Sequence, residues 1–379
     1  MLPETELLLR DQASELVFGL VAPVGANLDL LEADLAQQLD AYGYTANHVR
    51  LSSFLHGIQG LGVVLKDAPE FDRVKTHMDA GNQLRERLGS GEILALWAMA
   101  RIYEGRPVEK PERPRTAHIL RSIKHPDEVQ ALRAVYGSGF FLIGLAASRH
   151  EKIKNLKKRG LTAPEAEALI ERDAGEDDKF GQKTRDAFQL ADVHIRQGSR
   201  NGEASHQLGR FLRLVFGVND ETPTKDEHAM FLAYASSARS GDLSRQVGAV
   251  LWRDNVGVLA TGCNDVPAPG GGLYWAGPLD HRDRALGHDA NERHKQQIAE
   301  DVAKRVKDDL KDQQNLSLDE EALAIVHAAC LKTRLLDITE FGRAVHAEMD
   351  ALLGCARAGI STEGATLFCT TFPCHNCAK

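Results

Sequence analysis

The first half of the chain alternates short apolar runs with segments of helical periodicity. Residues 16–24 form a valine-rich apolar run, a glycine turn follows it, and leucines recur every four positions within residues 28–42. Such an order predicts a strand, a turn and a helix. Further strands are expected at residues 116–123, 139–147 and 191–196, and helices at residues 81–103 and 126–136. Strands that alternate with helices predict an α/β domain with a parallel sheet.

A second pattern begins after a polar, proline-bearing stretch at residues 218–225. We place a domain boundary there, between residues 1–222 and residues 223–379. The second domain is expected to contain a helix from near Thr224, strands at residues 246–252, 256–262 and 365–371, a hairpin turn at Arg253, Asp254 and Asn255, and a helix headed by His346. A long polar insertion, residues 279–340, separates the hairpin from that last helix.

The composition is that of a globular protein. The chain has 379 residues, 43% hydrophobic and 26% charged, and is longer than one ordinary core supports. Its net charge of -8 argues against broad, nonspecific binding to nucleic acid. The N-terminus lacks a signal-peptide pattern, and no apolar run approaches the ~20 residues that a membrane span needs. We therefore expect a cytoplasmic protein with no membrane partner.

The residues with the most distinctive chemistry lie near the end of the sequence. His346 and Glu348 are followed by a predicted strand and then by Cys374 and Cys377. The order H-x-E, then P-C-x-x-C, is a known signature of zinc deaminases. One histidine and two cysteines leave the fourth position of a tetrahedral zinc open for water, as in catalytic sites. His346, Cys374 and Cys377 are therefore the predicted Zn²⁺ ligands. Glu348 is the predicted acid and base for hydrolytic deamination of cytosine.

The spacing of these residues also restricts their geometry. Residues two apart point about 200° away from each other in the middle of a helix, so His346 and Glu348 can share a site only at a first turn. Pro373 predicts the start of a second helix, and two helix N-termini facing the ion would favour the thiolate forms of Cys374 and Cys377. A structural zinc site, or a chance coincidence of common residues, is the alternative.

The flanking segments resemble the deoxycytidylate deaminase family. They are SGDLSRQVGAV at residues 240–250, TGCNDVP at residues 261–267 and PCHNCAK at residues 373–379. The resemblance implies that Asn264 hydrogen-bonds the deoxyribose hydroxyl and that Arg239 or Arg245 helps to bind phosphate. A surface ion pair is the alternative for either arginine.

The long insertion departs from the usual pattern of that family. Within it, His281, His288 and His294 are spaced seven and six residues apart. A second zinc site occurs in parts of the family, but we expect solvent-exposed histidines in this polar segment.

The first half resembles nucleoside-phosphate kinases in its opening strand and glycine turn, and in three further segments. These are DAGNQLR at residues 79–85, RSIKHPDEVQALR at residues 121–133 and ADVHIRQGS at residues 191–199. Phosphate loops read G-x-x-x-x-G-K-[ST], whereas here Leu20 replaces the first glycine and Ala26 and Asn27 follow Gly25. The resemblance implies a P-loop-kinase-like fold without the phosphate lysine. Gly25, Ala26 and Asn27 could still hold a phosphate through backbone amides, without phosphoryl transfer. A purely structural relic is the alternative.

A kinase-like domain ahead of a deoxycytidylate-type deaminase resembles the bacterial antiphage dCTP deaminases. The resemblance implies Zn²⁺-dependent conversion of dCTP, and of dCMP, to deoxyuridine nucleotides, which would deplete the pool during infection. It also implies an inhibitory small RNA, a nucleotide in the N-terminal domain and a homo-oligomer. The alternatives are a polynucleotide cytosine deaminase and a non-catalytic RNA- or nucleotide-binding regulator with structural zinc.

The sequence stops at Lys379, two residues after the last predicted ligand. A deaminase fold is expected to need the body of the helix that begins at Cys374 and further strands beyond it. We therefore interpret the second domain as apparently truncated at its C-terminus.

Overall fold

The computed structural model describes residues 15–106, 115–176, 180–197, 202–314, 316–338 and 341–379. The chain forms two compact units, residues 1–221 (unit 1) and residues 222–379 (unit 2). Each unit is described by itself.

Unit 1 is built on a five-stranded sheet in the order β2-β3-β1-β4-β5, and all four pairings are parallel. The strands are β1 (Leu16–Val21), β2 (Thr45–Arg50), β3 (Thr116–Arg121), β4 (Phe140–Ala146) and β5 (Val193–Arg196). β1 is buried along its whole length, as expected for a strand covered on both faces. The prediction of an α/β domain with a parallel sheet is confirmed.

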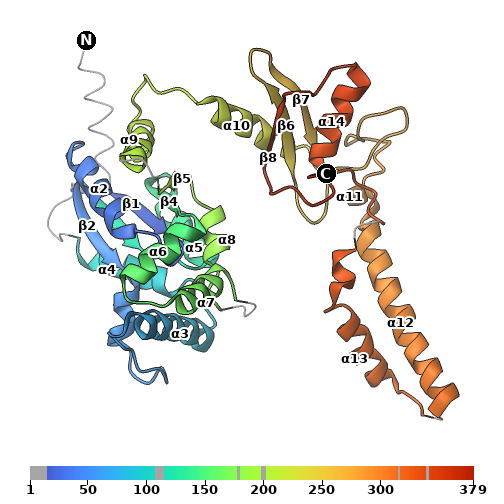
Figure 1. The fold of residues 1–379 in the computed structure, drawn as a ribbon, viewed down its shortest axis with the longest axis horizontal. Helices are drawn as coiled ribbons and strands as arrows, with labels where there is room; N and C mark the ends of the chain where they lie inside the picture. The colour runs from blue at the N-terminus through green and yellow to red at the C-terminus, as the bar shows by residue number, and fades with distance from the viewer. Residues whose placement is uncertain (1–14, 107–114, 177–179, 198–201, 315, 339–340) are drawn as a thin grey trace. The chain divides into compact units, whose positions relative to one another are not determined.

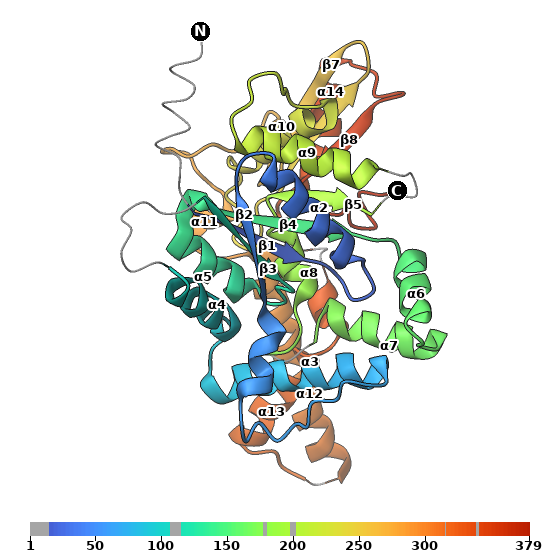
Figure 2. The same cartoon turned by 90° about the vertical axis from the view of Figure 1, so that its left-hand side faces the viewer.

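Helices cover both faces of this sheet (Figures 1 and 2). One face is covered by α2 (Leu28–Asp40) and α9 (Glu203–Val215). The other is covered by α4 (Ile93–Glu104), α5 (Pro126–Tyr136), α8 (Thr184–Gln189) and part of α3 (Glu70–Leu88). The helices α6 (Arg149–Lys158) and α7 (Ala163–Ala174) share a smaller apolar cluster with α3.

Two elements of unit 1 differ from the sequence prediction. The single helix expected at residues 81–103 is two helices, because Gly89 adopts a left-handed conformation (φ 62°) and ends α3. The strand β2 was not predicted. Only Val49 of its six residues is buried, so β2 lacks the apolar signal by which the other strands are recognised.

Unit 2 contains a three-stranded antiparallel sheet in the order β7-β6-β8. Its strands are β6 (Gly248–Arg253), β7 (Gly257–Cys263) and β8 (Thr366–Cys369). The predicted hairpin is confirmed, with Asn255 at positive φ and the Val256 N–H donating to Arg253 O.

Two helices enclose the sheet of unit 2, α10 (Lys225–Ser237) on one face and α14 (Ala347–Ala358) on the other (Figure 1). Glycines allow both to pack closely. A Cβ atom at Gly248 would lie 1.8 Å from Ala233 O of α10, and one at Gly262 would lie 2.3 Å from Ala347 O of α14. The close approach at Gly262 fixes the first turn of α14 against the end of β7.

The insertion is mostly helical. It contains α11 (Asp283–Leu286), α12 (Ala290–Gln314) and α13 (Glu320–Cys330), and α13 packs beside α12 (Figure 1). Short 3-10 helices lie at Leu51–Gly57 (η1), Gly137–Gly139 (η2) and Arg334–Asp337 (η3). Across the described ranges, every helix is too short or too polar to cross a bilayer.

Candidate metal and active site

The histidine of the H-x-E motif is placed by the start of a helix and by one backbone contact of its neighbour. His346 is the N-cap residue of α14, and Glu348 lies in that helix's first turn, as the spacing predicts. The preceding residue, Val345, donates its N–H to Asp265 O at 3.0 Å, which ties the segment to the chain just after β7. The His346 side chain makes no capping hydrogen bond, so its ring is available to other groups.

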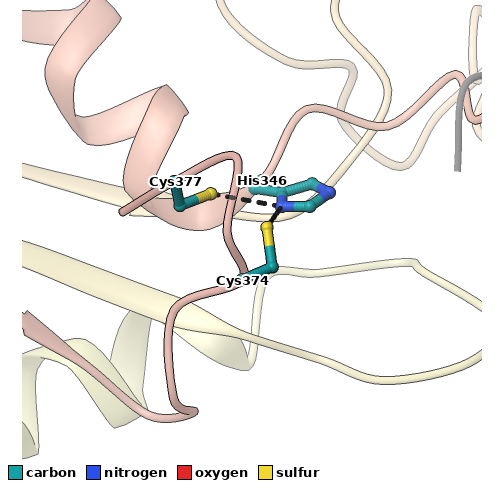
Figure 3. A group of neighbouring side chains, drawn as sticks. All are labelled: His346, Cys374 and Cys377. Atoms are coloured by element: carbon teal, nitrogen blue, oxygen red, sulfur yellow. Dashed lines mark hydrogen bonds between the residues drawn. The ribbon is translucent and has the colours of Figure 1, made fainter. Parts of the chain in front are cut away.

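The cysteines follow β8 in a turn. The N–H of Ala378 donates to Cys374 O at 2.9 Å, which closes one helical turn around Cys377. A helix was expected to begin at Pro373. The described residues contain one turn at this position. That turn still sets both thiols on the same side of the chain (Figure 3).

The histidine and both cysteines converge on a common point (Figure 3). His346 Nδ1 lies 3.2 Å from Cys377 Sγ and 3.4 Å from Cys374 Sγ, and the three ligand atoms all lie within 4.8 Å of one another. With ordinary zinc bond lengths and tetrahedral angles, a nitrogen and a sulfur ligand would be about 3.6 Å apart. The arrangement therefore fits a tetrahedral metal ion held by one nitrogen and two sulfurs.

Glu348 lies beside this group and is only 3% exposed. Its carboxylate is near enough to Cys377 and Cys369 to affect the pKa of both thiols. Burial raises the pKa of Cys377 to about 12, with further contributions from the charge of Glu348 and from Cys374. Burial, and then Glu348, also raise the pKa of Cys369. A cation at the site would act in the opposite direction on the thiols, because metal binding displaces thiol protons.

Asn264 lies at the end of β7 and its side chain is well anchored. Its Oδ1 accepts hydrogen bonds from Val247 N (2.7 Å) and Ser240 Oγ (3.0 Å), and its Nδ2 donates to Arg245 O (2.8 Å). The amide therefore holds the loop before β6 in place. The second N–H of Asn264 Nδ2 is the group predicted to hydrogen-bond the deoxyribose hydroxyl. That contact stays a prediction.

Arg239 supports a loop. Its guanidinium donates to Leu273 O (3.2 Å) and Tyr274 O (3.4 Å), lies 3.7 Å from Cys263 Sγ, and stacks 3.8 Å from the centre of the Trp275 ring. Of the two arginines predicted to bind phosphate, Arg239 is thus largely engaged within the protein.

Arg245 is exposed, and its Nη1 donates to Thr371 Oγ1 at 3.0 Å. Thr371 lies between β8 and the turn that carries Cys374 and Cys377. Arg245 therefore sits beside the chain segment that carries the two cysteines, with much of its guanidinium open to solvent.

The sequence did not single out Asp265, which is 2% exposed. Its carboxylate accepts the Gly241 N–H at 2.9 Å and lies 3.5 Å from Arg282 Nη1, while Arg282 makes a two-pronged contact with Asp280. Asp265 thereby connects the hairpin, the insertion and Val345 next to the site. The role of Asp265 could not be predicted from the sequence. Its partner Arg282 lies in the long insertion, where the sequence shows only that the residues are polar.

The three histidines of the insertion are exposed, as expected. His281 packs its ring on Tyr274, and His294 stacks on Phe341. His288 contacts a nearby backbone carbonyl. Among the described residues they do not form a metal-binding group.

The predicted phosphate loop of unit 1 connects β1 to α2. Gly25 has a φ of +88°, and a Cβ atom there would lie 2.8 Å from Lys152 O. Its own carbonyl accepts a hydrogen bond from Asn155 Nδ2 at 2.9 Å. The glycine is therefore explained by close packing against α6.

Three amides of this loop donate to protein acceptors. The Val24 N–H donates to Asp173 Oδ2 (2.7 Å), the Asn27 N–H to Gln197 Oε1 (2.8 Å), and the Ala26 N–H to a carbonyl within the loop. A phosphate contact by Gly25, Ala26 and Asn27 stays a prediction. An anion would have to displace the amide of Gln197 and approach the carboxylate of Asp173.

Unit 2 also matches a known protein family. Residues 223–379 match the cytidine and deoxycytidylate deaminase zinc-binding region. The match contains all four residues of the predicted active site. It assigns to this part of the chain a deaminase-type zinc domain.

Known proteins match over short stretches. The ComE operon protein 2 of Bacillus subtilis (strain 168) is 46% identical over 37 residues, which are 10% of this chain and 20% of that protein. The deoxycytidylate deaminase of Enterobacteria phage T2 is 54% identical over 35 residues, 9% of this chain and 19% of the phage protein. The chain thus spans about a fifth of the length of these curated relatives.

Two solved structures are similar over the larger part of the chain. A gluconokinase from Sinorhizobium meliloti 1021 has 15% identity and a TM-score of 0.28, covering 54% of this chain and 97% of the kinase. A shikimate kinase from Acinetobacter baumannii has 11% identity and a TM-score of 0.31, covering 56% of this chain and 99% of the kinase. Likeness at these TM-scores does not define a function for unit 1.

Proposed function

We propose that unit 2 catalyses the zinc-dependent hydrolytic deamination of cytosine in free deoxycytidine nucleotides, dCTP and dCMP. The observation that supports this most strongly is the convergence of His346, Cys374 and Cys377 beside the buried carboxylate of Glu348. The matching family and the phage deoxycytidylate deaminases support the nature of the substrate.

In this proposal each residue has one task. His346, Cys374 and Cys377 hold the ion, which when bound supplies a Lewis acid that makes water nucleophilic at neutral pH. Glu348 accepts one proton from the attacking water and gives it to the ring nitrogen N3; it then takes the proton of the hydroxyl added at C4 and gives it to the departing amino group. Water adds at C4, the bond to the amino group breaks, and uracil and ammonia result. The burial of Glu348 keeps these proton transfers away from bulk solvent.

We propose the substrate contacts from the positions of Asn264, Arg245 and Arg239. The Asn264 side chain donates to the backbone carbonyl of Arg245 in the loop before β6, and the Arg245 side chain contacts Thr371 near the cysteines. We assign the deoxyribose hydroxyl to Asn264 and the phosphates to Arg245. Arg239 is assigned an indirect role, because it holds the loop carrying Trp275.

The biological role is proposed by resemblance to antiphage dCTP deaminases. Deamination of dCTP would deprive a replicating phage genome of a precursor. An inhibitory small RNA and a homo-oligomer belong to the same proposal.

The experiment that tests the function supplies the purified chain with dCTP, dCMP, CTP and cytosine-containing single-stranded DNA in parallel. Mass spectrometry measures uracil products, and metal analysis of the same sample measures zinc per chain. We expect about one zinc and deoxyuridine products from the free deoxynucleotides. Deamination of DNA alone would instead identify a polynucleotide deaminase, and bound zinc with no product from any substrate would favour a regulator with structural zinc.

A further inference from the structure

Two arginines join the long insertion of unit 2 to the segment that carries His346. The helices α12 and α13 extend away from the three-stranded sheet (Figures 1 and 2). The connection lies instead at residues 280–283, which we call the insertion base. Arg282 belongs to the insertion base, and Arg343 reaches it from the other end of the insertion, three residues before His346 in the sequence.

Arg282 holds the side chain of Asp265 in place. Its Nε and Nη2 donate to the carboxylate of Asp280 at 2.9 and 2.7 Å, and its Nη1 lies 3.5 Å from Asp265 Oδ2. The Asp265 carboxylate also accepts the N–H of Gly241 at 2.9 Å and that of Val266 at 2.8 Å. A Cβ atom at Gly241 would lie 3.0 Å from Arg282 Nη1, so these groups are closely packed. The carboxylate, which is 2% exposed, is therefore fixed from three directions.

Arg343 ties the end of the insertion to the same base. Its Nη1 donates to Asp283 Oδ1 at 2.9 Å, and its Nη2 donates to His281 O at 2.7 Å. Because a guanidinium is planar and rigid, two acceptors fix its direction as well as its position. Asp283 is 8% exposed, so this ion pair is partly shielded from water.

The two arginines act on the two sides of one backbone bridge. The Val345 N–H donates to Asp265 O at 3.0 Å, directly before His346. Arg282 fixes the Asp265 side of this bridge, and Arg343 fixes the Val345 side. The His346 side chain makes no capping hydrogen bond to its helix, so the direction of its ring depends on the backbone that the bridge holds.

A metal ion tolerates little error in the position of its ligands. Ligand distances in zinc sites stay within about 0.2 Å of their usual values. His346 Nδ1 lies 3.2 and 3.4 Å from the two thiols, so its ring is already in position for an ion. A small shift of the bridge would therefore weaken the bond from His346 to the ion while the fold stays intact.

We propose that Arg282 and Arg343 are positioning residues of the metal site and that the insertion base holds His346 in place for the ion. The proposal rests on the proposed function only in that His346 is a zinc ligand. It gives the insertion a part in the metal site that the polar sequence of this segment does not indicate.

The first test measures the zinc affinity of the full chain by competition with a chelating dye, well below the thermal midpoint of each variant. Arg343→Gln should bind zinc about tenfold more weakly than the unchanged chain, which is typical when a group that orients a metal ligand is lost. Arg282→Gln should weaken zinc binding in the same direction. Arg343→Lys keeps a charged donor for Asp283 and should bind zinc more tightly than Arg343→Gln.

The second test replaces zinc with cobalt(II), whose visible absorption depends on the geometry of its ligands. The bands of Arg343→Gln should differ from those of the unchanged chain, and the bands of Arg343→Lys should lie closer to the unchanged ones. A role in stability alone would lower the thermal midpoint and leave the spectrum as it is.

Arg305→Gln is the matched control. Arg305 lies on α12 in an exposed ion pair with Asp309, so its loss removes the same charge from the same insertion, away from the base. Its zinc affinity and cobalt spectrum should equal those of the unchanged chain. Equal weakening by Arg305→Gln and Arg343→Gln would overturn the proposal, and so would no recovery in Arg343→Lys.

These measurements use no substrate, so they separate this proposal from the proposed function. Bound zinc without deamination of any substrate would defeat the proposed function alone. Zinc affinity and a cobalt spectrum that are the same in Arg343→Gln and in the unchanged chain would defeat the positioning role alone.

Discussion

Each unit has a helix N-terminus that the sequence marks as a candidate site, and the two are used differently. At α2 the N-cap residue, Asn27, makes no side-chain cap, and its N–H is taken by Gln197 from elsewhere in the fold. At α14 the N-cap residue, His346, also makes no side-chain cap, and its ring meets two thiols. A helix start offers donors in both cases, but the residues placed opposite it decide whether a ligand can use them.

The largest effect should come from removing a thiol opposite α14. Cys374→Ala leaves one nitrogen and one sulfur, too few donors for a stable zinc site, so the chain should lose both zinc and all measurable deamination. Metal analysis together with the dCTP assay checks this. Cys330→Ala is the control, since Cys330 lies on α13 in the same unit and belongs to no metal group. A Cys374→Ala protein that keeps its zinc would show that Cys374 is not a ligand.

Glu348→Gln should separate catalysis from metal binding. The amide keeps the size of the side chain but cannot carry the proton, so turnover should fall by about 10²–10⁴-fold. The zinc content should stay the same. Glu363→Gln, at an exposed position of unit 2, removes the same charge and should leave turnover unchanged. Full turnover by Glu348→Gln would exclude the carboxylate as the proton carrier.

The corresponding test at α2 changes Asp173, the residue that accepts a hydrogen bond from the loop between β1 and α2. Asp173 is fully buried and accepts hydrogen bonds from Val24 N, Lys124 Nζ and Thr184 Oγ1. Asp173→Asn breaks a buried ion pair, and we expect the free energy of unfolding of unit 1 to fall by about 3 kcal/mol. Denaturant unfolding followed by the fluorescence of Trp97, in a chain with Trp252→Phe and Trp275→Phe, measures this unit alone.

Glu167→Gln is the control for that change. Glu167 lies on the same helix, α7, in an exposed ion pair, and its loss should cost less than about 1 kcal/mol. If inorganic phosphate restored the stability of Asp173→Asn, the loop at α2 would be a phosphate site after all, and the contrast between the two helix starts would disappear.

Sequence could predict the α14 site better than the α2 loop for a physical reason. A helix start and a C-x-x-C turn are local, so the spacing of His346, Glu348 and the cysteines already restricted their geometry. Asp173, by contrast, is 149 residues from its partner Val24, and nothing near either residue signals the contact. Only the three-dimensional fold brings the carboxylate to the loop.

The same limit applies to the fold as a whole. Buried strands such as β1 were predicted from apolar runs, whereas β2, with one buried residue, carried no such signal. The insertion was recognised as polar but its helices were not, because α13 has no buried face that a periodicity could reveal.

The two arginines near the active site should respond differently to the same substitution. Arg245→Gln removes an exposed cation, so we expect the KM for dCTP to rise about tenfold at unchanged stability, since a charged hydrogen bond contributes about 1.5 kcal/mol. Arg239→Gln removes the support of the Trp275 loop and should lower the thermal midpoint of unit 2. Steady-state kinetics and thermal unfolding of both variants check this. An unchanged KM for Arg245→Gln would leave the phosphates without their assigned partner.

The smallest predicted effect is a loss of stability of unit 1 at acidic pH. It depends on Glu15, which lies in unit 1, and not on the candidate active site of unit 2. Glu15 precedes β1 and contacts His118 and Arg106. Burial would raise its pKa, but these partners outweigh burial and hold the pKa of Glu15 at about 2, below its usual 4.5. Because the folded value is the lower one, the contribution is complete above pH 4.5 and is lost as the pH falls toward 2. We expect a loss on the order of 1 kcal/mol after solvent screening, seen as a decrease in the Trp97 unfolding midpoint below pH 4.5. Glu15→Gln should flatten that decrease, and an unchanged slope in the variant would assign the acid sensitivity of unit 1 to other carboxylates.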